Sequence, residues 1–226
     1  MLKKSLKIIG CIVLLLVLGI AIIVFKGYRF YDSVFRLSYE NVKIAVGNTQ
    51  AECTMLKECE LRPGDILIRR YVTPVTKLFD ETLDPYFTHS AFYLGNDEIF
   101  EAVGNYAAPQ DQVVISQLSK SDWYDDGLED FIVFRPKNHT EKIDSIAENL
   151  KNIANDPQYV FGELSETKKT VSCSDILLKN IIDAEIATDT PQKPAIITPD
   201  YLFYAMESNP GDFDVVGYSL KPKIVR

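Results

Sequence analysis

The cysteine at position 173 stands at the start of a predicted amphipathic helix, where a thiol can act as a nucleophile. Ser172 followed by Asp175 has the form of an N-terminal cap with an acid in the first turn, and apolar residues follow at helical spacing from Ile176 to Ile182. A thiol in this place meets unpaired backbone N–H groups and the positive end of the helix dipole, and both favour the reactive thiolate. The alternative is a buried structural cysteine, since free cysteine is among the most buried residue types.

A histidine and a glutamate on a predicted β-hairpin could complete such a site. Strand alternation places His89 on one face of its strand and puts Glu101 on an otherwise apolar face, where a carboxylate needs a partner. A turn centred on Gly95 sets the two side chains opposite one another, whereas a turn centred on Asn96 and Asp97 offsets them by about three residues. If paired, they form a base oriented by a carboxylate, which lacks only its nucleophile.

Taken alone, each of these residues also fits an ordinary structural role. His89 could hydrogen-bond a backbone carbonyl, and Glu101 could be a solvated residue at a sheet edge. His139, at a predicted helix start, is expected on the surface. Because the chain has two histidines and no Cys-x-x-Cys pair, we expect no metal site and no cofactor.

The bulk composition is that of a globular protein with a negative surface. The chain has 226 residues, of which 46% are hydrophobic and 25% charged, and this balance argues against disorder. A formal net charge of −8 would repel nucleic acid, so no nucleic-acid partner is expected. Four cysteines are too few for a disulfide framework, although a bridge between Cys53 and Cys59 is compatible with the sequence.

The N-terminal segment predicts a membrane anchor. Three lysines within residues 1–7 precede an unbroken apolar run of 18 residues, which as a helix spans roughly 27 Å, close to the thickness of a hydrocarbon core. The run is longer than the core of a signal peptide and ends without a small-x-small cleavage site, so we expect it to be retained. The lysines and the N-terminus outweigh Lys26 and Arg29 at the far end, which favours a single-pass protein with its domain on the extracytoplasmic side.

The remaining sequence predicts an α+β fold. We expect an anchor over residues 1–28, a juxtamembrane helix and linker over 29–59, and the catalytic domain over 60–226. Alternating and apolar runs predict strands, and apolar stripes with caps predict helices. The strands are expected at 66–68, 88–95, 98–104, 113–115, 131–136 and 213–218, and the helices at 73–83, 140–154, 173–185 and 198–206. Hairpin connections favour an antiparallel sheet with helices packed against it.

Five short motifs in a fixed order resemble those of the circularly permuted papain-fold cysteine hydrolases of the YaeF/YiiX group, relatives of NlpC-type cell-wall peptidases and of lecithin:retinol acyltransferase. They are LRPGDIL at 61–67, THSAFYLG at 88–95, EAVG at 101–104, SCSDIL at 172–177 and TPDYL at 198–202. The resemblance covers roughly residues 61–218. It implies a circularly permuted papain-like (NlpC-type) domain with Cys173 as nucleophile, His89 as base and Glu101 as the residue that orients His89. Tyr159 is expected to line the substrate-binding side.

The function expected from these features is that of a membrane-anchored cysteine hydrolase or amidase, with acyl transfer as a variant. The Cys173 thiolate would attack an amide or ester carbonyl, and an acyl-enzyme would pass its acyl group to water or another acceptor. A cell-wall peptide fits an outward-facing domain, and a lipid-linked acyl group fits a domain held at a bilayer. The alternative is a catalytically silent binding or scaffolding module on the same fold. A membrane-protein assembly partner ranks last, because the small residues of the apolar run lack four-residue spacing.

Overall fold

The computed structural model of the protein describes a helical stretch near the N-terminus and most of the chain from residue 35 onward. The described residues are 14–19, 21, 35–47, 49–71, 86–103, 112–124, 128–137, 140–161, 169–187 and 193–220. The chain divides into two compact units, Met1–Val34 and Phe35–Arg226. Among the described residues, no helix has both the length and the apolar character needed to cross a membrane. Most of the expected anchor lies outside these residues, as does the helix expected at 73–83.

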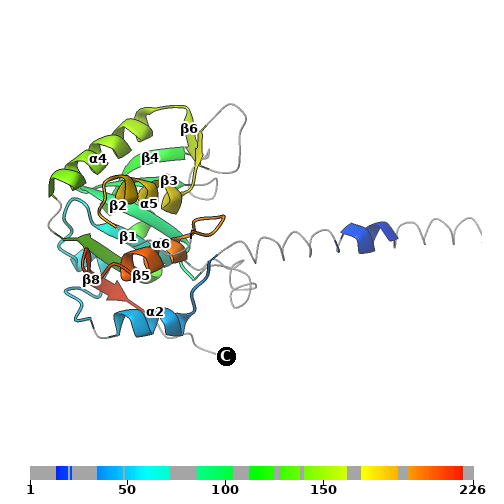
Figure 1. Ribbon diagram of the computed structural model, residues 1–226, viewed down its shortest axis with the longest axis horizontal. Helices are drawn as coiled ribbons and strands as arrows, with labels where there is room; N and C mark the ends of the chain where they lie inside the picture. Colours follow the sequence, from blue (N-terminus) through cyan, green and yellow to red (C-terminus); the bar gives the residue numbers. More distant parts are fainter. Residues whose placement is uncertain are drawn as a thin grey trace, which may run out of the picture. The chain divides into compact units, whose positions relative to one another are not determined.

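The second unit is built on a six-stranded antiparallel sheet with the strand order β4-β3-β2-β1-β5-β8 (Figure 1). A separate pair of short strands, β6 and β7, runs parallel and leads to the cysteine segment. The strands are β1 Ile66–Tyr71, β2 His89–Gly95, β3 Glu98–Val103, β4 Gln112–Gln117, β5 Leu128–Pro136, β6 Tyr159–Phe161, β7 Lys169–Val171 and β8 Phe213–Ser219.

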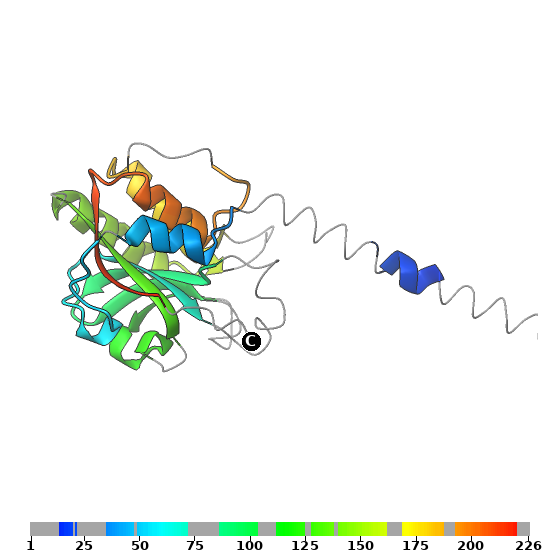
Figure 2. The same ribbon diagram turned by 90° about the horizontal axis from the view of Figure 1, so that it is seen from below.

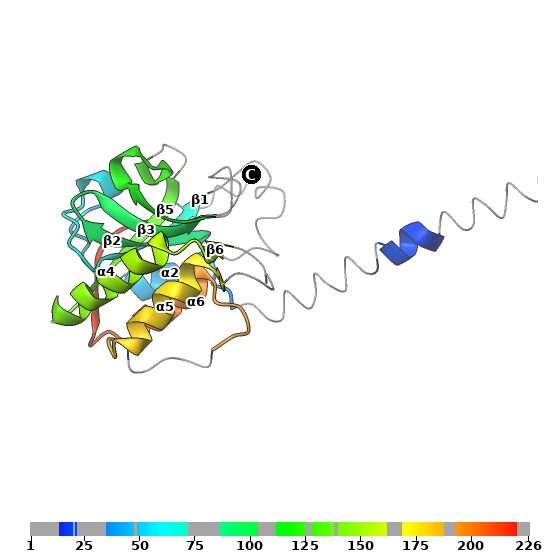
Figure 3. The same cartoon turned by 90° about the horizontal axis from the view of Figure 1, so that it is seen from above.

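Four α-helices cover one face of this sheet, and short 3-10 helices lie on the other face (Figures 2 and 3). The α-helices are α2 Tyr39–Val46, α4 Thr140–Asn155, α5 Cys173–Asp183 and α6 Pro199–Glu207, and the 3-10 helices are η1 Leu56–Glu58, η2 Leu118–Lys120 and η3 Asp122–Tyr124. The predicted α+β class with an antiparallel sheet is therefore confirmed. The helices expected at 140–154, 173–185 and 198–206 end within two residues of the observed bounds.

The two faces of the sheet build two separate hydrophobic clusters. On the helical face, Phe92 and Phe100 pack with side chains of α4, α5 and α6. On the opposite face, Ala91 and Ile99 pack with Trp123 of η3 in a smaller cluster. Consecutive strand residues point to opposite faces, so β1, β2, β3, β5 and β8 each contribute to both clusters. Three polar residues whose side chains carry charge or can transfer protons lie on the face of the smaller cluster: Arg69, His89 and Glu101.

The hairpin of β2 and β3 turns at Asn96 and Asp97, and this turn sets the register of His89 and Glu101. Both turn residues have positive φ, 52° and 66°, which asparagine and aspartate tolerate better than most residues. The register pairs Phe92 with Phe100, with an irregularity near Gly95. Continued along the strands, this register puts Glu101 beside Ala91, the next residue on the face of His89. The side chains are therefore diagonal neighbours on one face, with a smaller offset than the sequence predicts for this turn.

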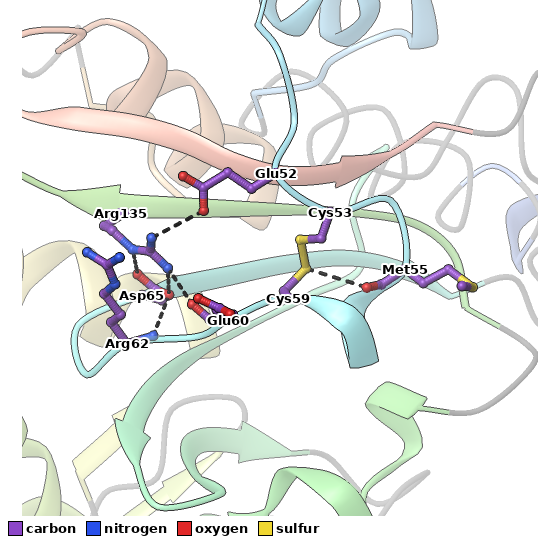
Figure 4. The surroundings of a disulfide bond; sticks show 8 residues. All are labelled: Glu52, Cys53, Met55, Cys59, Glu60, Arg62, Asp65 and Arg135. Atoms are coloured by element: carbon purple, nitrogen blue, oxygen red, sulfur yellow. Dashed lines mark hydrogen bonds and ion pairs between the residues drawn. A yellow bond between two sulfur atoms is a disulfide. The ribbon is translucent and has the colours of Figure 1, made fainter.

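The segment expected to be a linker contains a disulfide (Figure 4) and is attached to the sheet by backbone hydrogen bonds to β8. Cys53 and Cys59 form the disulfide, and the backbone of Cys53 pairs with Gly217 of β8 in an isolated β-bridge. A Cβ atom at position 217 would collide with the two sulfurs. The neighbouring Asp65 closes the turn at Pro63–Gly64, since its N–H donates to the carbonyl of Arg62, and its side chain is fully buried. Its carboxylate accepts two hydrogen bonds of 2.8 Å from the guanidinium of Arg135. The sequence does not decide whether Cys53 and Cys59 are bonded, and the structure shows the disulfide.

Capping residues start both α5 and α6, as predicted. Ser172 accepts a hydrogen bond of 3.1 Å from the backbone N–H of Asp175, and Thr198 caps α6 in the same manner. Asp200 in the first turn of α6 is fully buried and accepts three backbone hydrogen bonds. The donors are the N–H groups of Leu37 at 2.8 Å, Tyr86 at 2.7 Å and Phe87 at 2.6 Å. Asp200 thereby fixes the backbone that leads into β2 and hence the position of His89.

Candidate active site

His89, the first residue of β2, is paired with Glu101 of β3. Nε2 of His89 lies 3.0 Å from Oε2 of Glu101, and the two side chains are 13% and 6% exposed. A carboxylate can only accept hydrogen bonds, so Nε2 donates and Nδ1 remains for another partner. The imidazole is therefore held in one orientation by an acid, as a catalytic base requires.

Two further donors hold the Glu101 carboxylate. The hydroxyl of Ser116 on β4 donates to Oε1, and the indole Nε1 of Trp123 donates to Oε2 over 3.1 Å. Burial by itself raises the pKa of a carboxyl group, but the hydrogen bonds from His89, Ser116 and Trp123 and the charge of His89 outweigh it and lower the pKa of Glu101 to about 2. Glu101 is thus a fixed negative charge next to the imidazole at any physiological pH.

Cys173 is the first residue of α5 and packs against the sheet next to β2. It is a free thiol, and it is 7% exposed. Burial would raise the pKa of the thiol, but the charge of His89 and hydrogen bonds with His89, Ser90 and Ser174 lower it to about 7. The α5 helix packs on the helical face, whereas His89 belongs to the opposite face. Since His89 opens its strand, its ring can reach past the strand end to the sulfur.

The same interaction has the opposite effect on the imidazole. Burial lowers the pKa of His89, but the charge of Cys173, its hydrogen bond and the hydrogen bond to Glu101 raise the pKa to about 9, against an opposing contribution from Arg69. Each group thus shifts the pKa of the other in the direction that favours a thiolate beside an imidazolium. This ion pair is a nucleophile and a general acid in contact.

A pair of buried serines lies behind the thiol. Ser90 follows His89 on the opposite face of β2, and Ser174 follows Cys173 in α5. Their hydroxyl oxygens are 3.0 Å apart, and the Ser174 oxygen is 3.7 Å from the sulfur. Both serines are fully buried, and both hydrogen-bond the Cys173 side chain. They join α5 to β2 and supply hydroxyl donors that stabilise a thiolate.

Tyr159, expected to line the substrate-binding side, lies in β6. Its ring packs at the margin of the larger cluster, and Nζ of Lys169 lies 4.7 Å from the ring centroid. The structure brings together Cys173, His89 and Glu101. Tyr159 packs against the cluster that contains Cys173, and its role in substrate binding stays a prediction. His139 lies outside the described residues.

The described part of the chain contains no group of three or more histidine, cysteine, aspartate or glutamate side chains that could hold a metal ion. The polar groups at the thiol come from β2 and α5, and those around the His89–Glu101 pair come from β1, β4 and η3. What this arrangement can do chemically follows from a nucleophile, a proton carrier and a fixed carboxylate in series.

Sequence reasoning did not find five residues of this site. They are Arg69, Ser90, Ser116, Trp123 and Ser174. One signal was present for Trp123, because it is the only tryptophan of the chain and stands in an otherwise polar, turn-rich stretch. The serines carry no comparable signal, since a hydroxyl on a strand or helix is common and its partner comes from a distant segment.

Comparisons with known proteins give no family for this chain. No protein-family model matches it. No curated protein matches it. Function is therefore inferred from the residues and their geometry.

Proposed function

We propose that this protein is a cysteine hydrolase that cleaves amide or ester bonds through an acyl-enzyme. The observation that carries the proposal is the buried series from Glu101 through His89 to Cys173, in which a carboxylate orients an imidazole and the imidazole lowers the pKa of a thiol. Few structural roles require a thiolate and an imidazolium in contact, and perturbed pKa values cluster at functional sites.

The proposed reaction has two halves. The Cys173 thiolate attacks the carbonyl carbon, and the carbon–sulfur bond forms as the carbonyl electrons move to oxygen. When the tetrahedral intermediate collapses, the bond to the leaving nitrogen or oxygen breaks, and the His89 imidazolium gives that atom its proton. Neutral His89 then takes a proton from water, whose oxygen attacks the thioester, and the acid product leaves as the thiolate and imidazolium are restored.

The start of α5 supports stabilisation of the intermediate. The first N–H groups of a helix have no partners within the helix, and the N-terminus carries the positive end of the helix dipole. We assign the backbone N–H of Cys173 as one donor to the developing oxyanion. The Ser172 cap holds this helix start in place through the N–H of Asp175.

The domain is proposed to be of the circularly permuted papain-like, NlpC-type class. In support, the chain order is histidine strand, carboxylate strand and then cysteine helix, the order of the YaeF/YiiX motifs that the sequence resembles. A thiol at the start of a helix packed on an antiparallel sheet, with the histidine at the start of a strand, is also compatible with that class.

The proposed substrates are a cell-wall peptide amide or a lipid-linked acyl group, and the proposed attachment to a membrane is the N-terminal apolar run. The Cys53–Cys59 disulfide supports a domain on the extracytoplasmic side, because disulfides persist mainly in oxidising compartments. Cys173 is 7% exposed, so only a narrow acyl portion of the substrate can reach the sulfur in this conformation.

The low exposure of Cys173 also favours a second candidate, a catalytically silent binding or scaffolding module. In such a module, the Cys173–His89 pair would fasten α5 to the sheet. The two candidates differ in whether an external electrophile reaches the sulfur as a thiolate.

Alkylation of the full chain in detergent by iodoacetamide tests the proposal. Peptide mapping separates Cys173 from the other three cysteines, and the rate is followed between pH 5 and pH 10 in the protein, in His89→Ala and in the matched variant His139→Ala. We expect half-maximal reaction near about pH 7, against about 8.5 for an ordinary thiol. His89→Ala should move it above about 8.5, because burial then acts without a counter-charge. Slow alkylation indifferent to His89 would leave the binding module as the better account.

A further inference from the structure

Arg69 of β1 stands beside the candidate base. In the register of β1 and β2, Arg69 is the direct partner of His89, so the two side chains project from the same face of the sheet on neighbouring strands. The residue is only 5% exposed. Arginine is rarely buried unless its charge is paired, because burying an ion has a high desolvation cost.

The guanidinium of Arg69 is held by a short helix on the other side. Its Nη2 lies 2.8 Å from Oδ2 of Asp122, and its Cζ lies 4.4 Å from the centroid of the Trp123 ring. Two of its nitrogens, Nε and Nη1, are buried and have no hydrogen-bond partner within the part of the chain that the structure describes. Asp122 therefore holds the Nη2 end of the guanidinium, and the guanidinium lies over the Trp123 ring.

Trp123 connects this cation to the candidate site. Its indole N–H donates to the Glu101 carboxylate over 3.1 Å, and its ring centroid is 5.7 Å from that of His89. The contacts thus run in series from Asp122 to Arg69, Trp123, Glu101 and His89. A displacement of the indole would remove a donor from Glu101 and leave the imidazole less firmly oriented.

We propose that Arg69 is a positioning residue that clamps Trp123 onto Glu101 and opposes the positive charge of His89, so that the imidazolium gives up its proton more readily. The inference rests on the proposed role of His89 as proton carrier. Asp122 has the complementary role, because it neutralises part of the charge that Arg69 presents to the imidazole.

The charged groups that face His89 come from three elements. Cys173 of α5 and Glu101 of β3 favour the imidazolium, and Arg69 of β1 disfavours it. Removing Arg69 and removing Asp122 should therefore have opposite effects on the imidazole. A merely structural role would instead make both variants change the site in the same direction, by loosening it.

Histidine NMR of the full chain in detergent measures this directly, because the chain has only two histidines. His139→Gln assigns the two signals. We expect Arg69→Met to raise the pKa of His89 by about one pH unit, since a neighbouring like charge has been removed. Asp122→Asn should lower it, and Arg69→Lys, which keeps the charge, should leave it near the value of the unmodified protein.

Arg70 provides a matched control. It follows Arg69, points to the opposite face, is equally buried and stacks on a different ring, that of Tyr86, with Cζ 4.8 Å from the centroid. Arg70→Met removes the same side chain from the same strand and should leave the pKa of His89 unchanged. If Arg69→Met fails to fold, Arg69→Gln, which also removes the charge but keeps a polar side chain, takes its place in the comparison with Asp122→Asn, whose side chain is 39% exposed in the unmodified protein.

Shifts of opposite sign for Arg69→Met and Asp122→Asn support the proposal. Shifts of one sign, no shift in a folded Arg69→Met protein, or an equal shift in Arg70→Met would overturn it. The titration needs no substrate and no reaction at Cys173, so it is separate from the alkylation test. Normal alkylation with an unmoved His89 pKa would reject Arg69 alone, whereas a Cys173 indifferent to His89 would reject the proposed function.

Discussion

Two consecutive arginines of β1 place the same kind of assembly on the two faces of one sheet. Arg69 stacks on Trp123 and pairs with Asp122 beside the smaller cluster. Arg70 stacks on Tyr86, and its Nη1 lies 4.0 Å from Asp130, inside the larger cluster under the helices. In both cases a buried cation, an aromatic ring and an acid occur together.

The assemblies differ in what the aromatic residue contacts. The Tyr86 hydroxyl donates to Asp130 over 2.5 Å, so that side's hydrogen bond stays within the core. The Trp123 indole donates instead to Glu101, which holds His89. The buried charge of Arg70 therefore contributes to packing on the helical face. The buried charge of Arg69 on the opposite face instead acts on His89 through Trp123 and Glu101. Variants of Arg70 and Tyr86 should change stability alone, and variants of Arg69 and Trp123 should also change the reactivity of the thiol.

The largest effect is expected for Phe100→Ala, which empties a fully buried site on the helical face. The lost contacts and the cavity should lower the free energy of unfolding by about 3–5 kcal/mol. Urea unfolding of the full chain, followed by the fluorescence of the single tryptophan, measures it. In the fraction that remains folded, the pH midpoint of Cys173 alkylation should be unchanged. A shifted midpoint would show that the two faces are not separate.

Glu101→Gln, on the other face of the same strand, should lower both stability and reactivity. The folded pKa of Glu101, about 2, lies below its unfolded value, so the ionised group stabilises the fold. This contribution, about 3 kcal/mol, is complete above about pH 4.5 and is lost as the pH falls toward about 2. Urea unfolding between pH 2 and pH 7 should show a flatter acid limb in the variant.

The same substitution should slow alkylation of Cys173 at pH 7 by roughly tenfold or more, because a neutral amide does not stabilise the imidazolium. Glu98→Gln, at the start of the same strand, is the matched control and should leave the rate unchanged. Equal rates in Glu101→Gln and in the unmodified protein would remove Glu101 from the site.

Two aspartates allow the comparison to be made with one type of substitution. Asp200→Asn, on the helical face, replaces one of two hydrogen-bonded carboxylate oxygens by an N–H₂ group that meets a backbone donor, and should cost about 2 kcal/mol. Asp122→Asn breaks a partly exposed ion pair and should cost less than about 1 kcal/mol. Thermal unfolding ranks the two variants. A greater loss of stability in Asp122→Asn than in Asp200→Asn would contradict the expectation that buried charge contributes more to stability on the helical face.

Modest effects are expected at the helix caps. Ser172→Ala and Thr198→Ala should each cost about 1 kcal/mol, because each removes the acceptor for a first-turn N–H. Only Ser172→Ala should slow alkylation of Cys173, since α5 alone begins with the thiol. Alkylation that slows equally in Thr198→Ala would mean that the caps act on Cys173 through general stability.

Local patterns predicted the parts of the site that depend on neighbouring residues. The cap at Ser172, the strand of His89 and the strand of Glu101 all follow from spacing and alternation. The register did not, because the irregularity at Gly95 shifts the strands by an amount that the turn sequence does not specify. The diagonal contact of His89 and Glu101 is therefore a result of tertiary structure.

The residues that sequence analysis missed are those whose partners lie far along the chain. Arg69 and Trp123 meet only because η3 folds back over the sheet, and Asp200 is buried because it collects backbone N–H groups from two distant segments. Asp65 is a similar case, since its partner Arg135 lies on β5. No periodicity of the sequence records such contacts.

The Cys53–Cys59 bridge has a consequence for how a chain with a reactive thiol is oxidised. Cysteines close in sequence meet more often in an unfolded chain than distant ones, because closing a short loop costs less entropy. The bridge is therefore expected to form early and locally, before Cys173 can be captured in a mixed pairing. Burial of Cys173 between the start of α5 and the sheet then shields the sulfur from further exchange. We therefore expect the Cys53–Cys59 disulfide to help keep Cys173 a free thiol while the protein folds.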